Sequence, residues 1–180
     1  MDTAEDKKED RKIERKELAA RKKAPAWIAK CVAHWEARLN ECDLGVDFAD
    51  ADILCWRCGH MRKLQRCHII ASSLGGADTE DNIVPLCTSC HDEMPNVGDA
   101  GAVWEWIKRT KSTFYDSFHI QRGMDLAKSL GVELDRIDQK SLRYLMEWTS
   151  RHWMQNGGGP TTSPESIAWC LRNAAQRIKV

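Results

Sequence analysis

The stretch that decides the fold runs from Cys55-Trp56-Arg57-Cys58 to Cys87-Thr88-Ser89-Cys90. Each end is a pair of cysteines separated by two residues, and 28 residues lie between the pairs. Four thiolates at such spacing suit a tetrahedral zinc ion with Zn–S distances of about 2.3 Å, and four soft ligands leave no open position for chemistry. Gly59 fits the tight turn that a knuckle makes around its ion. The pattern predicts a structural zinc site made by Cys55, Cys58, Cys87 and Cys90.

Two other interpretations of these cysteines are weaker. Four unrelated buried thiols rarely fall into two matched pairs, and a redox C-x-x-C motif would need one pair within a βαβ pattern. The isolated Cys31, Cys42 and Cys170 are expected to be buried free thiols. The N-terminal residues are charged and lack the apolar core of a secretory signal, so the expected setting is cytoplasmic and reducing. No apolar run approaches the roughly 18 residues of a membrane span.

The insert between the two pairs carries a second and more specific pattern. It contains Arg66-Cys67-His68-Ile69-Ile70, a loop with Gly75-Gly76, the run Asn82-Ile83-Val84-Pro85-Leu86-Cys87, and finally Cys90-His91. From Cys55 to Met94 the chain resembles the HNH endonucleases, also called ββα-metal nucleases. The resemblance implies an α+β fold in which a zinc-stapled ββα-metal core is embedded in a mainly α-helical chain.

By this resemblance, His68, Asn82 and His91 are the catalytic residues. Phosphodiester hydrolysis needs a base that activates water and a cation that stabilises charge on the phosphate and the leaving oxygen. A neutral imidazole suits the base near pH 7. The resemblance makes His68 the base, gives its orientation to Asn82, and makes His91 a ligand of the catalytic metal. It also implies products with 5′-phosphate and 3′-hydroxyl ends.

Cys67 departs from the family pattern, in which an Asp or His just before the base often binds the metal. Three outcomes are open. Cys67 binds a transition metal together with His91, or it packs within the strand while Asp92, Glu93 or Asn82 completes a magnesium site, or the catalytic metal is absent. The first two are favoured over the third. Adjacent strand residues point to opposite faces, so Cys67 and His68 share one site only if a bulge interrupts the alternation.

Charge is balanced over the whole chain but not along it. The 27 Lys and Arg equal the 27 Asp and Glu, which excludes a strongly basic polyanion binder of the histone kind. Residues 1–23 hold 9 basic and 7 acidic residues, a mixture typical of a solvated helix or tail; a nucleic-acid arm is the less favoured alternative. Phosphate contacts are expected instead from a basic cluster formed by Arg57, Arg62, Lys63 and Arg66.

Composition and break signals divide the chain into four parts. Residues 1–24 are a charged helix or tail, 25–54 a helix with an acidic lead-in, 55–95 the core, and 96–180 a helical region. Apolar periodicity predicts helices over 26–42, 101–130 and 139–155, and Ser163 with Pro164 opens a last helix. Short β-type runs at 66–70 and 83–86 supply two strands.

The function expected from these residues is a metal-dependent endonuclease acting on DNA. Its cofactors would be a structural zinc ion and a catalytic divalent cation, either Mg²⁺, Mn²⁺, Ni²⁺ or Zn²⁺. Because cutting both strands usually needs two active sites, a homodimer is expected, in a restriction, phage-defence or mobile-element setting. The alternatives are a non-catalytic zinc module that binds nucleic acid or a partner protein, and an RNA-cleaving nuclease of the same family.

Overall fold

The protein was described from a computed structural model. The structure describes residues 4–113, 117–133, 138, 140–141, 143–144, 147–148 and 163–178. The chain forms two compact units, Met1–Tyr115 and Asp116–Val180, so the helix after residue 96 lies in the same unit as the cysteine pairs. Among the described residues, no helix is both long and apolar enough to cross a membrane.

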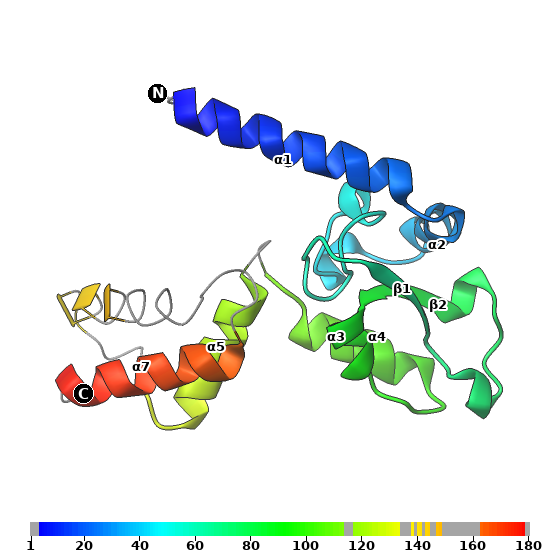
Figure 1. Ribbon diagram of the computed structural model, residues 1–180. Coiled ribbons are helices and arrows are strands. Elements are labelled where there is room, and N and C mark those ends of the chain that lie inside the picture. The colour runs from blue at the N-terminus through cyan, green and yellow to red at the C-terminus, as the bar shows by residue number, and fades with distance from the viewer. Residues whose placement is uncertain are drawn as a thin grey trace. The chain divides into compact units, whose positions relative to one another are not determined.

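The first unit carries a short sheet with a helix directly behind it, and Figure 1 shows this arrangement. The strands β1 (Leu64–His68) and β2 (Ile83–Cys87) are antiparallel, and α3 (Thr88–Asp92) follows β2 without a gap. This order is the predicted ββα core, and the α+β class is confirmed. The other helices of the unit are α1 (Ala4–Lys23), α2 (Ala26–Glu36) and α4 (Ala100–Thr110).

The register of the sheet separates its two ends. Leu64 pairs with Cys87 at one end, and His68 pairs with Ile83 at the other. All of β2 is buried, as expected of a strand that helices cover. One of these helices is α2, whose Trp35 Nε1 donates to the Ile83 carbonyl at 2.9 Å.

The predicted helices of the first unit are shorter in the structure than their apolar periodicity suggests. The helix expected over 26–42 ends at Glu36, and Asn40 then accepts a hydrogen bond from Cys42 N, which begins a 3₁₀ turn. The helix expected over 101–130 is interrupted after Thr110, where Ser112 N donates to the Arg57 carbonyl at 2.8 Å. In both cases the backbone that follows the helix makes a hydrogen bond outside the helix.

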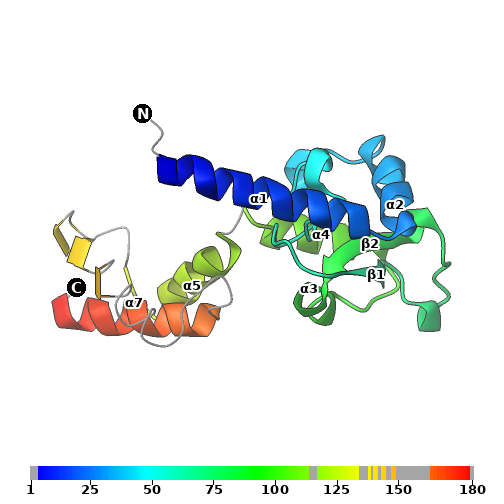
Figure 2. The same cartoon turned by 45° about the horizontal axis from the view of Figure 1, so that its top comes forward.

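The second unit is a pair of packed helices, α5 (Phe118–Ser129) and α7 (Pro164–Ile178), which lie side by side in Figure 2. Gly123 allows this close approach, since a Cβ there would lie 2.5 Å from the Ile167 Cβ. Ser163 caps α7 as predicted, because its Oγ accepts from Ser166 N at 3.2 Å. Most of the helix expected over 139–155 lies outside the described residues.

Candidate active site and metal centre

The four paired cysteines form one buried cluster. The sulfur atoms of Cys55, Cys58, Cys87 and Cys90 all lie within 4.8 Å of one another. Gly59 adopts φ +68°, and its N–H donates to the Cys55 carbonyl at 2.9 Å, which closes the turn of the first knuckle. Hydrogen bonds from the Cys55 and Cys58 thiols lower the pKa of Cys87, so the cluster favours a thiolate there. Four soft donors in this arrangement fit a tetrahedral zinc ion.

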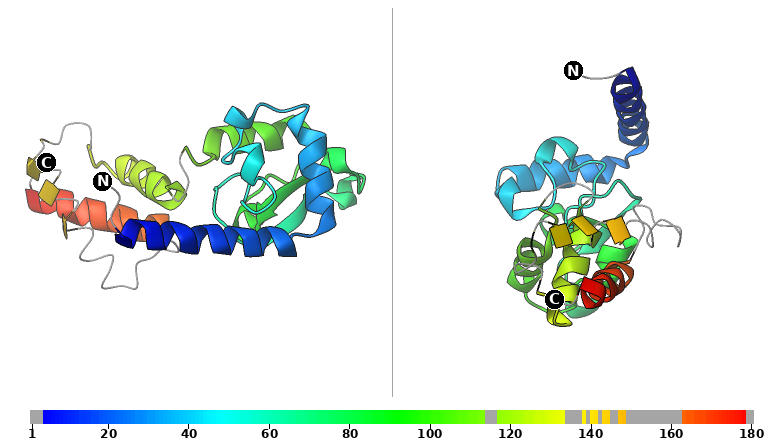
Figure 3. Two further views of the ribbon diagram at one scale, coloured as in Figure 1. Left: turned by 90° about the horizontal axis from the view of Figure 1, so that it is seen from above. Right: turned by 90° about the vertical axis from the view of Figure 1, so that its left-hand side faces the viewer.

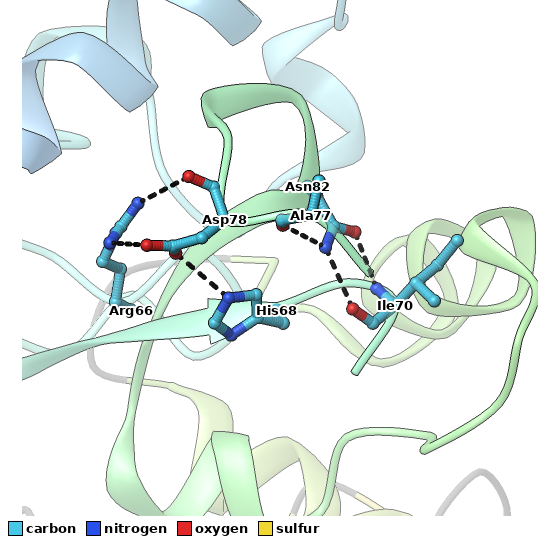
Figure 4. A network of polar contacts seen from close by, with 6 residues as sticks. All are labelled: Arg66, His68, Ile70, Ala77, Asp78 and Asn82. Carbon is cyan, nitrogen blue, oxygen red and sulfur yellow. Dashed lines mark hydrogen bonds and ion pairs between the residues drawn. The ribbon is translucent and has the colours of Figure 1, made fainter. Parts of the chain in front are cut away.

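His68 ends β1 and faces a carboxylate. Its Nε2 lies 3.1 Å from Asp78 Oδ1, while Arg66 Nη1 donates to the other carboxylate oxygen at 2.9 Å (Figure 4). Arg66 and His68 share a face because strand side chains alternate. The hydrogen bond from Arg66 lowers the pKa of Asp78, so this side chain is a carboxylate at neutral pH. A neutral His68 ring that donates from Nε2 to this carboxylate keeps Nδ1 as its proton acceptor.

Asn82 holds the loop that carries this carboxylate. Its Oδ1 accepts from Ile70 N at 2.8 Å, and its Nδ2 donates to the carbonyls of Ile70 and Ala77 at 2.9 and 2.8 Å (Figure 4). Gly76 leaves room for this contact, since a Cβ there would lie 1.8 Å from the Ile70 carbonyl oxygen. Asn82 fixes the ends of a loop, and Asp78 contacts the His68 ring directly; the orienting role expected of Asn82 stays a prediction and would act through this loop.

His91 stands on α3, one residue after Cys90 of the cysteine cluster. Its Nδ1 lies 2.7 Å from Gln65 Oε1, which holds the ring against β1. His68 and His91 line the same pocket, which has a volume of about 480 Å³. The other lining residues are Ala71, Ser72, Ser73, Asp92, Met94 and Asn96. The structure therefore brings two of the three predicted catalytic residues together at one pocket.

A family comparison covers this same stretch. The model that describes the HNH endonucleases matches residues 53–95. These residues are an HNH domain. No curated protein and no solved structure matches the chain. The domain includes the cysteine cluster, His68, Asn82 and His91, and the proteins that this model describes are nucleases.

Cys67 lies inside the HNH domain, away from the pocket. Its side chain is fully buried and its Sγ faces the Gln65 carbonyl at 3.5 Å. Burial raises the pKa of the Cys67 thiol to about 12, which opposes the thiolate that a metal would need. The structure thus gives Cys67 a packed strand position, which argues against the first of the three outcomes; the magnesium site of the second outcome stays a prediction.

Arg57 is also inside the domain, so its expected contact with nucleic acid is corrected. Only 2% of its side chain is exposed, and its guanidinium lies 4.2 Å from the centre of the Trp106 ring. It donates to Thr110 Oγ1 at 2.8 Å and to Glu93 Oε2 at 2.9 Å. Because both contacts join the zinc knuckle to neighbouring helices, Arg57 stabilises the domain and cannot reach a phosphate.

The rest of the predicted basic cluster has mixed surroundings. Lys63 is exposed and Arg62 is half-buried. Arg66 is exposed, but it forms the ion pair with Asp78. Phosphate contact by these three residues stays a prediction.

Among the residues that the structure describes, the four cysteines make the one group of three or more metal-binding side chains whose ligand atoms gather. A second cation in the HNH domain would therefore take few ligands from the protein. His91 and Asp92, which both line the pocket, offer an imidazole nitrogen and a carboxylate. This donor set fits a hard cation that keeps several of its own waters.

Two residues of the site were missed from the sequence. Asp78 contacts the ring of His68, and Gln65 contacts the ring of His91. A signal for Asp78 exists, since Arg66 and His68 share one strand face and an acid follows the glycine pair. Gln65 has no such signal, because its partner lies 26 residues away.

Proposed function

We propose that the protein is a metal-dependent endonuclease that hydrolyses DNA phosphodiester bonds, with His68 as the general base. The observation that carries the proposal is that His68 and His91 line one pocket on an HNH domain. The zinc cluster supports this geometry, because Cys90 directly precedes His91 and holds the short helix α3 in place.

The chain's own residues account for the proton transfer. Nδ1 of His68 takes a proton from the water whose oxygen bonds to phosphorus, while the bond from phosphorus to the leaving oxygen breaks. The ring then carries a positive charge next to the Asp78 carboxylate, 3.1 Å from Nε2. That carboxylate stabilises the imidazolium and fixes the tautomer, as the buried acid does in a serine-protease triad. Arg66 keeps the carboxylate in position.

The catalytic cation would be held by His91 and Asp92 at the wall of the pocket. When bound, it supplies positive charge to the phosphate and the leaving oxygen. Gln65 orients the His91 ring through its Nδ1 at 2.7 Å, so the opposite nitrogen of the ring is the one available as a ligand.

The test is a nicking assay on supercoiled plasmid DNA with Mg²⁺, Mn²⁺, Ni²⁺ or Zn²⁺. The wild type should nick the plasmid with at least one of these ions, and His68→Ala should lower the rate roughly 10²- to 10⁴-fold, because general-base catalysis contributes that much. His34→Ala removes an imidazole from α2, outside the lining of the pocket, and should leave the rate unchanged.

Equal nicking by His68→Ala and the wild type would reject the general-base role. Failure of the wild type with all four cations would reject the nuclease assignment. The same panel on single-stranded RNA checks the substrate, and cleavage of RNA alone would overturn the choice of DNA.

We also propose that a homodimer performs the double-strand cut. The pocket that His68 and His91 line has His68 as its candidate base, and the two DNA strands present two scissile bonds. Sedimentation of the zinc-loaded protein should show a mass near twice the chain mass of 20.5 kDa. A monomer that linearises plasmid in a single binding event would contradict this proposal.

A further inference from the structure

The helix α1 is tied to the HNH-containing unit by its last turn. Arg21 Nη2 donates to Asp50 Oδ1 at 2.6 Å, and Nη1 contacts Asp52 and the Ala49 carbonyl. These acceptors lie just before the first zinc knuckle. Figure 3 shows the N-terminal part of α1 extending from the body of this unit. Arg21 thus ties the last turn of α1 to the acidic segment that precedes the first cysteine pair.

Within residues 11–23 of α1, helical geometry places most of the basic side chains on one side. At 100° per residue, six basic side chains fall within an arc of about 140° between residues 11 and 23, with Ala19 as the other member of the arc. All six are exposed. They are Arg11, Lys12, Arg15, Lys16, Lys22 and Lys23. We call this arc the basic face of α1.

The opposite side of the helix has a different composition. It carries both acids of residues 11–23, Glu14 and Glu17, together with the anchoring Arg21. The exposed Ile13 and Leu18 also lie there. Residues 11–23 hold seven basic residues and two acids, so this part of the segment is basic, and the helix places both acids away from the basic face; five of the seven acids of residues 1–23 lie in residues 1–10.

The basic face matches the charge pattern of a nucleic-acid backbone. Its six positive side chains extend over roughly 18 Å of helix axis, and a DNA duplex presents one negative charge for about every 1.7 Å. We propose that the basic face of α1 binds the phosphodiester backbone of the nucleic acid on which the HNH domain acts. The inference rests on the proposed function for the identity of the substrate.

An anionic membrane is the other surface that a basic helix could bind, and α1 fits it poorly. A helix that lies in the membrane interface needs a wide apolar side opposite its charges. The side opposite the basic face offers two large apolar residues, Ile13 and Leu18, beside Glu14 and Glu17. Burying those carboxylates in the interface would be unfavourable, so the backbone of a nucleic acid is the better partner.

The test measures binding of the full zinc-loaded chain to a fluorescent 30-base-pair DNA duplex. A His68→Ala background keeps the duplex intact. The face variant changes Arg15, Lys16, Lys22 and Lys23 to Gln, which preserves helix propensity and the Arg21 anchor. The matched control changes four exposed basic residues of the second unit to Gln, namely Lys128, Lys140, Arg143 and Arg172. Far-UV circular dichroism should show the same helix content in both.

The face variant should raise Kd at least tenfold at 0.1 M salt, and the control less than twofold. The slope of log K against log salt should become shallower by about 3 to 4, since each lost phosphate contact removes roughly 0.9. In the His68-containing protein the same four changes should raise the KM for nicking and leave kcat unchanged, because the face lies outside the pocket.

Equal affinity and equal salt slope in the face variant and its parent would overturn the inference. Loss of binding to phosphatidylserine vesicles without loss of binding to DNA would overturn it in favour of a membrane. If the wild type failed to cut DNA while the face variant lost DNA binding, the proposed function would fail and this inference would stand. Normal cutting with no effect of the face variant would reject this inference alone.

Discussion

The two ends of the β1–β2 pair differ in how they are built. At the Leu64–Cys87 end, four buried thiols gather within 4.8 Å and leave no free position for substrate. At the His68–Ile83 end, His68 is half-buried, its partner Asp78 is exposed, and a pocket of about 480 Å³ opens beside them. One short sheet thus has a closed cysteine cluster at one end and an open pocket at the other. The helix α3 connects them, because it carries both Cys90 and His91.

The largest effect is expected from disrupting the cysteine cluster at the Leu64–Cys87 end of the sheet. Cys87→Ser should lose the bound zinc and unfold the first unit, because a structural zinc site contributes folding free energy directly. Elemental analysis should find at least one zinc per wild-type chain and none in the variant, and circular dichroism should show lost structure.

Cys42→Ser is the control, since Cys42 is an exposed thiol rather than the buried one that its context suggested. It should keep both zinc and fold. A metal-free wild type that melts cooperatively would contradict the zinc assignment.

The second largest effect is expected from removing the Asn82 side chain, which holds the loop near the His68–Ile83 end of the sheet. Asn82→Ala would leave the Ile70 N–H and two carbonyls without their partner in a part-buried site. At about 1 to 3 kcal/mol for an unsatisfied buried group, we expect a loss of roughly 3 kcal/mol in the free energy of unfolding. Urea denaturation measures this loss. A change below 0.5 kcal/mol would show that the loop does not depend on Asn82.

A smaller effect should follow from Asp78→Asn. The rate of nicking should fall roughly 10- to 100-fold with unchanged zinc content, because the ring loses the carboxylate that fixes its tautomer and stabilises its charged form. Nitrogen NMR of His68 should show less of the Nε2-protonated tautomer. Asp81→Asn, in the same loop and exposed, is the control and should change neither measurement. An unaltered tautomer with a reduced rate would argue against the positioning role.

The smallest effect concerns pH. The hydrogen bond from Arg66 lowers the pKa of Asp78, so the ion pair is fully present above the ordinary carboxyl value and is lost as pH falls through the lowered one. Arg66→Gln should therefore raise the pKa of Asp78 toward the ordinary value of an aspartate side chain. Carbon NMR of the carboxyl group measures it. An unmoved titration would mean that solvent screens the pair completely.

Prediction from the sequence succeeded best where spacing along the chain carries the information. The matched cysteine pairs and the run around His68 indicated both the cysteine cluster and the two strands, since a knuckle and a hairpin are local structures. It was less successful for side chains whose neighbours come from far along the chain. The sequence predicts that Arg57 is a surface cation. Its burial depends on Trp106 and Thr110 of α4, which are distant in the sequence.

The amino-acid sequence alone indicated the cysteine cluster and the two strands, because these follow from residue types at short separations, and its resemblance to the HNH endonucleases indicated the ββα order and the candidate base. Only the tertiary structure decided which side chains contact one another at the site. Cys67 points into the interior, Asn82 bonds to the loop backbone, and Asp78 contacts the His68 ring. Strand alternation and loop closure set these side-chain directions. The tertiary structure also placed the basic face of α1 on one side of the helix and both acids of residues 11–23 on the other, because a helix groups residues three and four apart.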